Sequence, residues 1–70
     1  MSSAIAPEFS GYALLQARKA AGIDPRELAR RARVSPERLH QLERGRAIPT
    51  FDAALRLAAV LRVPVTELAI

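Results

Sequence analysis

Two helix-start signals lie only eleven residues apart in this sequence, and they limit the possible folds more than any other feature does. Asp24 and Ser35 carry side chains that cap a helix N-terminus, and each is followed by a proline. Proline is favoured at the first helical position because the N–H that it lacks would have no partner there. The first helix of the pair can therefore extend only to about residues 31–33. Two helices joined by so few residues cannot lie antiparallel, so they must cross at a steep angle.

Further cap and stop signals predict three more short helices around this pair. Ser, Thr and Asp are favoured before a helix, while Gly is favoured just beyond its end. No strand signal is present, so we predict an all-α fold of five short helices. The signals are Ser10 and Gly22 for the first helix, Gly45 for the end of the third, Thr50 for the start of the fourth, and Pro64 for a short final helix through residues 66–68.

Helical periodicity assigns a face to the residues of these helices. On the first helix, Arg18 shares one face with Leu14 and Ala17, so an arginine lies beside an apolar stripe. On the third helix, Glu43 lies on the same inner side as the leucines. Arg56 and Arg62 are expected to be solvated. The fourth helix is expected to bury a stripe of five apolar residues: Phe51, Ala54, Leu55, Ala58 and Leu61.

Composition excludes several classes of chemistry. The chain has no cysteine, which rules out disulfides, iron–sulfur clusters and cysteine-bound zinc. His40 is the only histidine, so a histidine-rich metal site is impossible and a Ser-His-Asp triad is not expected. No apolar run approaches the roughly 20 residues needed to span a bilayer, and the N-terminus lacks the features of a secretory signal. We therefore expect a cytoplasmic protein that is not an enzyme, does not bind a membrane, and has no metal or cofactor.

The chain is long enough for one small domain. Residues 1–9 (MSSAIAPEF) show no periodicity and contain Pro7, so we expect a disordered N-terminal arm there. The folded domain is expected over residues 10–70.

The positive charge is concentrated in the middle of the chain. Residues 11–50 carry nine Lys and Arg against four Asp and Glu, a net charge of +5, whereas residues 51–70 are neutral. A localised arginine-rich segment is typical of a nucleic-acid-binding protein. A solvated face of a soluble domain is the alternative explanation of the charge alone.

The third helix carries side chains that can recognise bases. In a steeply crossed helix pair, the second helix can leave one face free to enter a DNA major groove. Glu37, His40 and Gln41 share such a face here. Gln can bond bidentately to adenine, Glu can accept from cytosine N4, and His can donate to a purine N7 or to a phosphate. The arrangement predicts a helix-turn-helix protein that binds DNA.

The segment from residue 11 to about residue 68 resembles the Cro/repressor-type helix-turn-helix (XRE) family. The match is an ordered set of short pieces at family spacing, and any single piece is a weak signal. The pieces are Glu27-Leu28-Ala29, Val34-Ser35, the run from Leu39 to Glu43 followed by Gly45, and the closing Val63-Pro64-Val65-Thr66-Glu67-Leu68. The resemblance implies a lambda-repressor-like DNA-binding domain of five short helices.

The resemblance also implies roles for individual residues. Arg18 and Glu43 match positions that form a buried salt bridge in the family. Arg33 stands at a turn position that the family often gives to glycine, and Pro25 stands where the family often has a Gln that clamps the DNA backbone. The base-contacting positions are Pro36, Glu37, His40 and Gln41. We expect phosphate contacts from Arg33, Arg38, Arg44, Arg46 and Thr50, with Asp24 and Pro25 also at phosphate-contacting positions.

These inferences predict a sequence-specific transcriptional regulator of double-stranded DNA, repressor-like, with residues 35–44 as the recognition helix. The alternative is a protein–protein interaction module or an antitoxin on the same scaffold. Apolar residues near the chain end leave two further interpretations open. Residues 60–70 form a homodimer interface, or they pack on a missing domain of a longer regulator.

Overall fold

The computed structural model describes residues 8–70, and within this range the chain forms four α-helices and one 3-10 helix, η1. The all-α prediction is therefore confirmed for the described residues, with the final short helix formed as a 3-10 turn. An arm was predicted over residues 1–9, and its residues 1–7 lie outside the described residues. The elements are α1 (Gly11–Ala21), α2 (Pro25–Ala32), α3 (Pro36–Glu43), α4 (Phe51–Leu61) and η1 (Val65–Leu68).

Each α-helix begins at a side chain that the sequence marks as a cap. The Ser10 hydroxyl accepts from the Ala13 N–H at 3.0 Å, and Thr50 does the same for α4. Asp24 and Ser35 cap α2 and α3 in the same way. Each of these bonds satisfies a backbone N–H that has no partner inside the helix. The short lengths of α2 and α3 follow directly from these closely spaced caps.

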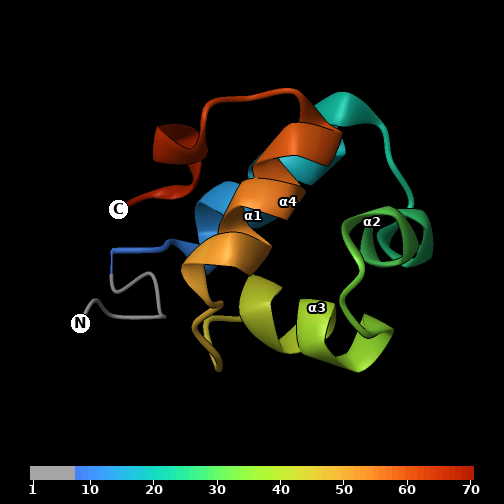
Figure 1. Ribbon diagram of the computed structural model, residues 1–70, viewed down its shortest axis with the longest axis horizontal. Helices are drawn as coiled ribbons and strands as arrows, with labels where there is room; N and C mark the ends of the chain where they lie inside the picture. Colours follow the sequence, from blue (N-terminus) through green and yellow to red (C-terminus); the bar gives the residue numbers. More distant parts are fainter. Residues whose placement is uncertain (1–7) are drawn as a thin grey trace.

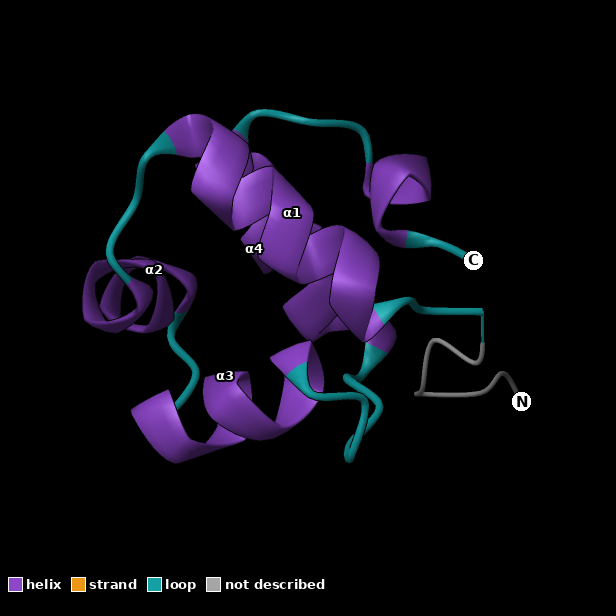
Figure 2. Ribbon diagram, turned by 180° about the vertical axis from the view of Figure 1, so that it is seen from behind, coloured by secondary structure: helices purple, strands orange, loops and turns teal. Residues whose placement is uncertain are grey.

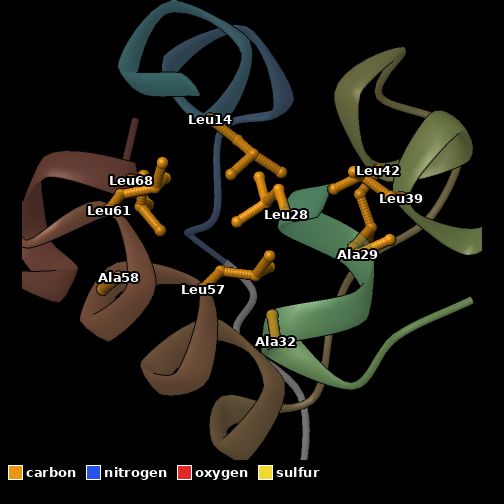
Figure 3. Packing of buried hydrophobic residues seen from close by; sticks show 10 residues of the cluster. All are labelled: Leu14, Leu28, Ala29, Ala32, Leu39, Leu42, Leu57, Ala58, Leu61 and Leu68. Carbon is orange, nitrogen blue, oxygen red and sulfur yellow. The ribbon is translucent and has the colours of Figure 1, made fainter. Parts of the chain in front are cut away.

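The core is built from leucines and alanines of all five elements. Leu14, Leu28, Leu42 and Leu57 are fully buried, and Figure 3 shows their side chains converging from α1, α2, α3 and α4. The buried alanines of α2 and α4 let neighbouring helices approach closely. A core of this size stabilises the fold mainly through apolar burial, at roughly 25 cal/mol for each Å² of apolar surface removed from water.

The elements pack so that α3 is supported from two sides. α1 contacts α3, α4 and η1, while α2 contacts both α3 and α4. Figure 1 shows α4 crossing in front of α1, with α3 along the lower edge and α2 beside it. Figure 2, from behind, shows α1 in front and leaves one long side of α3 at the edge of the molecule. The steep crossing of α2 and α3 agrees with the prediction from their short connection.

The buried face of α4 differs from the predicted stripe. Phe51 and Leu55 were expected inside, but they are 49% and 42% exposed, whereas Leu57 is fully buried. The prediction is confirmed for Ala54, Ala58 and Leu61, which are buried. It was wrong for Phe51 and Leu55 because α4 is apolar on nearly every side, so periodicity alone does not select a face. Contacts with α2 and η1 select it instead.

The two ends of the described chain lie side by side. Phe9 forms an isolated antiparallel bridge with Ala69. The Ser10 N–H donates to the Leu68 carbonyl at 2.7 Å, and the Ile70 N–H donates to the Glu8 carbonyl at 2.7 Å. These bonds tie the start of α1 to the segment after η1, so Glu8 and Phe9 belong to the folded domain.

Candidate nucleic-acid interface

The turn between α2 and α3 is closed by a non-glycine residue in a left-handed conformation. Arg33 has φ 60° and ψ 43°, and its N–H donates to the Ala29 and Arg30 carbonyls. The Val34 N–H also donates to Ala29, at 3.0 Å. These bonds satisfy the last carbonyls of α2, while a side chain in this conformation costs roughly 1 kcal/mol. Arg33 therefore sets the angle at which α3 leaves α2, as expected for the position that the family often gives to glycine.

One face of α3 is free of the protein. Pro36, Glu37, His40 and Gln41 are all exposed, while Leu39 and Leu42 on the opposite face are buried. The hydrogen bonds formed among residues 8–70 use none of these four side chains. The polar groups of this face are therefore available to an external ligand. The structure brings together all four residues that the sequence predicts to contact bases.

Exposed cations surround this face of α3. Arg33 lies in the turn before the helix, Arg44 is its C-cap, and Arg46 follows in the loop. Thr50 begins α4, where its hydroxyl accepts from the Ala53 N–H. Arg33, Arg44 and Arg46 thus lie near the two ends of α3, an arrangement that suits the two sugar–phosphate strands bordering a groove, whereas Arg38 lies within α3 and Thr50 is the N-cap of α4.

A largely buried ion pair fixes the C-terminal end of α3 to α1. The Arg18 Nε lies 2.6 Å from the Glu43 Oε2, and a second nitrogen of the same guanidinium donates to Oε1 at 3.3 Å. The third nitrogen donates to the Ile23 carbonyl at 3.0 Å. The two side chains are only 13% and 11% exposed. This is the pair expected from the sequence, and loss of one partner would leave a buried charge at a cost of about 3–5 kcal/mol.

The start of α1 packs directly on the end of α3, a contact that sequence reasoning missed. Gly11 is buried, and a Cβ atom at this position would lie 2.2 Å from the Leu42 carbonyl oxygen and 3.0 Å from the Gly45 nitrogen. The neighbouring atoms are backbone, so they cannot rotate away. Only glycine fits between the two helices at this separation.

Arg56 of α4 also supports the turn, although it was expected to be solvated. Its Nε donates to the Ala32 carbonyl, the last residue of α2, at 2.8 Å. Arg56 and Arg38 both line a groove of about 320 Å³ between α3 and α4. The lining contains no acidic residue; it comprises Val34, Ser35, Arg38, Leu42, Pro49, Thr50, Ala53 and Arg56. The groove therefore extends the basic surface from the free face of α3 toward α4.

The start of α2 carries acidic side chains. Asp24 and Pro25 are exposed, and the Asp24 carboxylate is used in accepting from the Arg26 N–H at 3.0 Å. Glu27, which stands where a capping box would need it, instead pairs with Arg30 at 2.6 Å. The hydrogen bond from Arg30 holds the pKa of the Glu27 carboxyl below its ordinary value. This end of α2 offers less positive charge than the two ends of α3.

No group of three His, Asp or Glu side chains within residues 8–70 is placed to hold a metal ion. None of the helices described there has the length and apolar character to cross a membrane.

Known proteins show the same arrangement of helices. The helix-turn-helix family model matches residues 14–68. ClgR, the clp gene regulator of Corynebacterium glutamicum, is 36% identical with a TM-score of 0.80; the match covers 83% of this chain and 62% of that one. The restriction-modification controller protein C.AhdI of Aeromonas hydrophila is 28% identical with a TM-score of 0.79, over 83% of this chain and 88% of that one.

A third solved structure was determined with a nucleic acid. SinR, a master regulator for biofilm formation, was crystallised in complex with DNA; it is 34% identical with a TM-score of 0.78, over 83% of this chain and 94% of that one. The match thus covers 94% of the SinR chain in the DNA complex, but only 57% of the matched chain in the SinR–SinI complex and less than two thirds of ClgR. No curated protein sequence gives a significant match.

Proposed function

Because this chain belongs to the XRE-type helix-turn-helix family of DNA-binding regulators, we propose that it is a sequence-specific, repressor-like transcriptional regulator that places α3 in the major groove of duplex DNA. The observation that carries the proposal is the free face of α3, with four exposed residues facing away from the core. The family and the neighbours do not favour the interaction-module and antitoxin interpretations, although SinR has also been solved in a complex with the SinI protein.

Within this proposal each residue of the face has a distinct task. Gln41 bonds bidentately to an adenine, and Glu37 accepts from a cytosine N4 amino group. His40 donates to a purine N7 or to a phosphate. Pro36 presents an apolar ring at the start of α3, which suits contact with a thymine methyl group.

The surrounding arginines position the protein and attract it to DNA. Arg33, Arg44 and Arg46 are exposed and close to the ends of α3, so they can reach phosphates on both sides of the groove. Arg38, with Thr50 across the α3–α4 groove, extends this contact. Each neutralised phosphate releases counterions, so affinity should fall steeply as salt rises.

Selection from a randomised duplex pool, followed by affinity measurements across a salt series, tests the proposal. We expect one motif to be enriched. Gln41→Ala should weaken binding to that motif by about 5- to 150-fold, the equivalent of one bidentate base contact of roughly 1–3 kcal/mol. The slope of log affinity against log salt concentration (the salt slope) should stay unchanged, because no phosphate contact is lost. Arg44→Ala should weaken binding to all sequences and lower the salt slope by about 1.

Gln16→Ala is the matched control, because Gln16 is an exposed glutamine of α1 outside this face. It should bind as the unmodified protein does. If no motif is enriched, or if Gln16→Ala and Gln41→Ala behave alike, α3 does not contact bases and the proposal fails.

A further inference from the structure

The groove between α3 and α4 has an apolar floor and a polar rim. Three buried side chains and one half-buried side chain form the floor: Leu42, Pro49, Ala53 and Val34. Two hydroxyls and two guanidinium groups form the rim: Ser35, Thr50, Arg38 and Arg56. The groove volume of about 320 Å³ is at the lower end of the roughly 300–1,000 Å³ that small-molecule sites occupy. A floor and a rim of this kind suit a small molecule with one polar end.

The groups of the rim are chiefly hydrogen-bond donors. The Ser35 hydroxyl accepts from the Arg38 N–H at 3.0 Å, and the Thr50 hydroxyl accepts from the Ala53 N–H at 3.0 Å. Each hydroxyl therefore keeps its own O–H to donate, while a guanidinium has donors and no acceptor. The Arg38 guanidinium takes part in no hydrogen bond among residues 8–70. The lining holds no acidic residue, so the complementary ligand group is an anion that accepts hydrogen bonds.

Arg56 is held in place before any ligand binds. Its Nε donates to the Ala32 carbonyl at 2.8 Å, and its two terminal nitrogens make no hydrogen bond among residues 8–70. The planar fork of a guanidinium matches the two oxygens of a carboxylate. Because the Nε bond already restricts this side chain, a ligand that binds it loses less conformational entropy than one that must order a free arginine. Arg56 is therefore the best-prepared anion-binding group of the groove.

We propose that this groove binds a small carboxylic acid with a compact apolar body, for which benzoate is a suitable probe. The carboxylate accepts from Arg56 and from the hydroxyls of Ser35 and Thr50, and the apolar body covers the floor. A bare inorganic anion satisfies the donors but leaves the floor in contact with water. A neutral apolar molecule covers the floor but leaves the guanidinium groups without an anion. Only an amphipathic acid matches both parts of the groove.

The same ligand regulates the protein, and this part of the inference rests on the proposed function. Arg38 and Thr50 line the groove and are also predicted phosphate contacts. A carboxylate bound beside them neutralises positive charge and occupies the Thr50 hydroxyl, so fewer donors remain for the DNA backbone. The acid and the duplex should therefore weaken each other's binding by the same factor, because the coupling between two ligands is reciprocal.

Amide NMR shifts of the protein without DNA, followed during titrations at constant ionic strength, test the binding. Benzoate should shift the amides of Ser35, Ala53 and Arg56 with a Kd of about 1 mM, because so small a ligand gains little binding energy. Benzamide has nearly the same shape and no charge, whereas inorganic phosphate has charge and no apolar body. Each of these two should bind about tenfold more weakly than benzoate.

Two substitutions test the residues of the rim. Arg56→Lys keeps the positive charge and removes the planar fork, and Arg38→Gln removes a charge that makes no bond within the described fold. Each should weaken benzoate binding by about fivefold. Arg26→Gln is the matched control, because Arg26 is an exposed arginine of α2 outside the groove. Arg38→Gln decides the question if Arg56→Lys does not fold.

Addition of benzoate to the complex with the selected duplex tests the regulation. At 10 mM benzoate the duplex affinity should fall by about tenfold, the competition factor for a ligand at ten times its Kd. Benzamide at the same concentration is the control and should leave the affinity nearly unchanged.

Three results would overturn the proposal: no amide shifts with benzoate, equal affinities for benzoate and benzamide, or equal benzoate affinities of the two rim variants and Arg26→Gln. Phosphate binding as tight as that of benzoate would also overturn it and would make the groove a site for simple anions. Unchanged duplex affinity with benzoate bound would overturn the regulatory part alone. If no DNA motif is enriched, the proposed function fails, while the NMR titration still decides whether the groove binds the acid.

Discussion

Replacing Gly11 with alanine should push the recognition helix out of place. The added Cβ would lie 2.2 Å from the Leu42 carbonyl oxygen, whereas ordinary van der Waals contact begins at 3.4 Å. The end of α3 must therefore move by about 1.2 Å, the difference between these distances, because all three nearby atoms are backbone.

The energetic cost has two opposing parts. Overpacking of a well-packed contact costs typically about 1–3 kcal/mol. The higher helix propensity of alanine stabilises a helix by up to about 1 kcal/mol relative to glycine, and by less at the first helical position. We expect a net loss of about 1–2 kcal/mol in the free energy of unfolding, which lowers Tm by roughly 5–15 °C for a domain of this size.

Thermal melting and DNA affinity, measured together, test this reasoning. Gly22→Ala is the matched control, because a Cβ there meets nothing within 4 Å while its φ of 69° makes alanine strained. Both variants should lose stability, but only Gly11→Ala should also lose affinity for the selected duplex at a temperature where both are folded. A Tm at or above that of the unmodified protein, as helix propensity alone predicts, would refute the argument. Equal affinity of the two variants would also refute it.

Three further substitutions test the supports of the interface. Arg18→Ala should destabilise the domain by about 3–5 kcal/mol, whereas exposed Arg26→Ala should change its stability little; equal melting temperatures would contradict a buried ion pair. Arg33→Gly should raise stability by roughly 1 kcal/mol by relieving the left-handed strain, yet weaken DNA binding through the lost guanidinium; a lower Tm would contradict the strain. Arg56→Ala should lower the free energy of unfolding by about 1 kcal/mol through the lost bond to the α2 C-terminus, and Arg56→Lys should recover part of this loss. An unchanged denaturant unfolding curve for Arg56→Ala would show that the bond does not stabilise the domain.

Local backbone chemistry explains what was predictable from sequence. The starts of α2 and α3 at Pro25 and Pro36 depend only on a capping side chain and on the ring that follows it, so the structure agrees with the prediction. The free face of α3 was predictable for a similar reason. Its two leucines are its main apolar residues, so only one face could be buried.

The faces of α4 were not predictable in this way. α4 is apolar on most sides, and its periodicity allows several stripes, of which the predicted one placed Phe51 and Leu55 inside. The packing of α2 and η1 selects the stripe that includes Leu57. The same packing leaves Phe51 and Leu55 as the outer surface of α4.

By itself, then, the sequence determined where the helices of the central pair begin, and that Arg18 and Glu43 lie on inner faces. These properties follow from residues within one or two helical turns of each other. Only the tertiary structure decided that Gly11 must stay a glycine and that Arg56 holds the end of α2. Both depend on atoms more than twenty residues apart in the chain, whose distance is set by how whole helices pack and not by any local preference of the backbone.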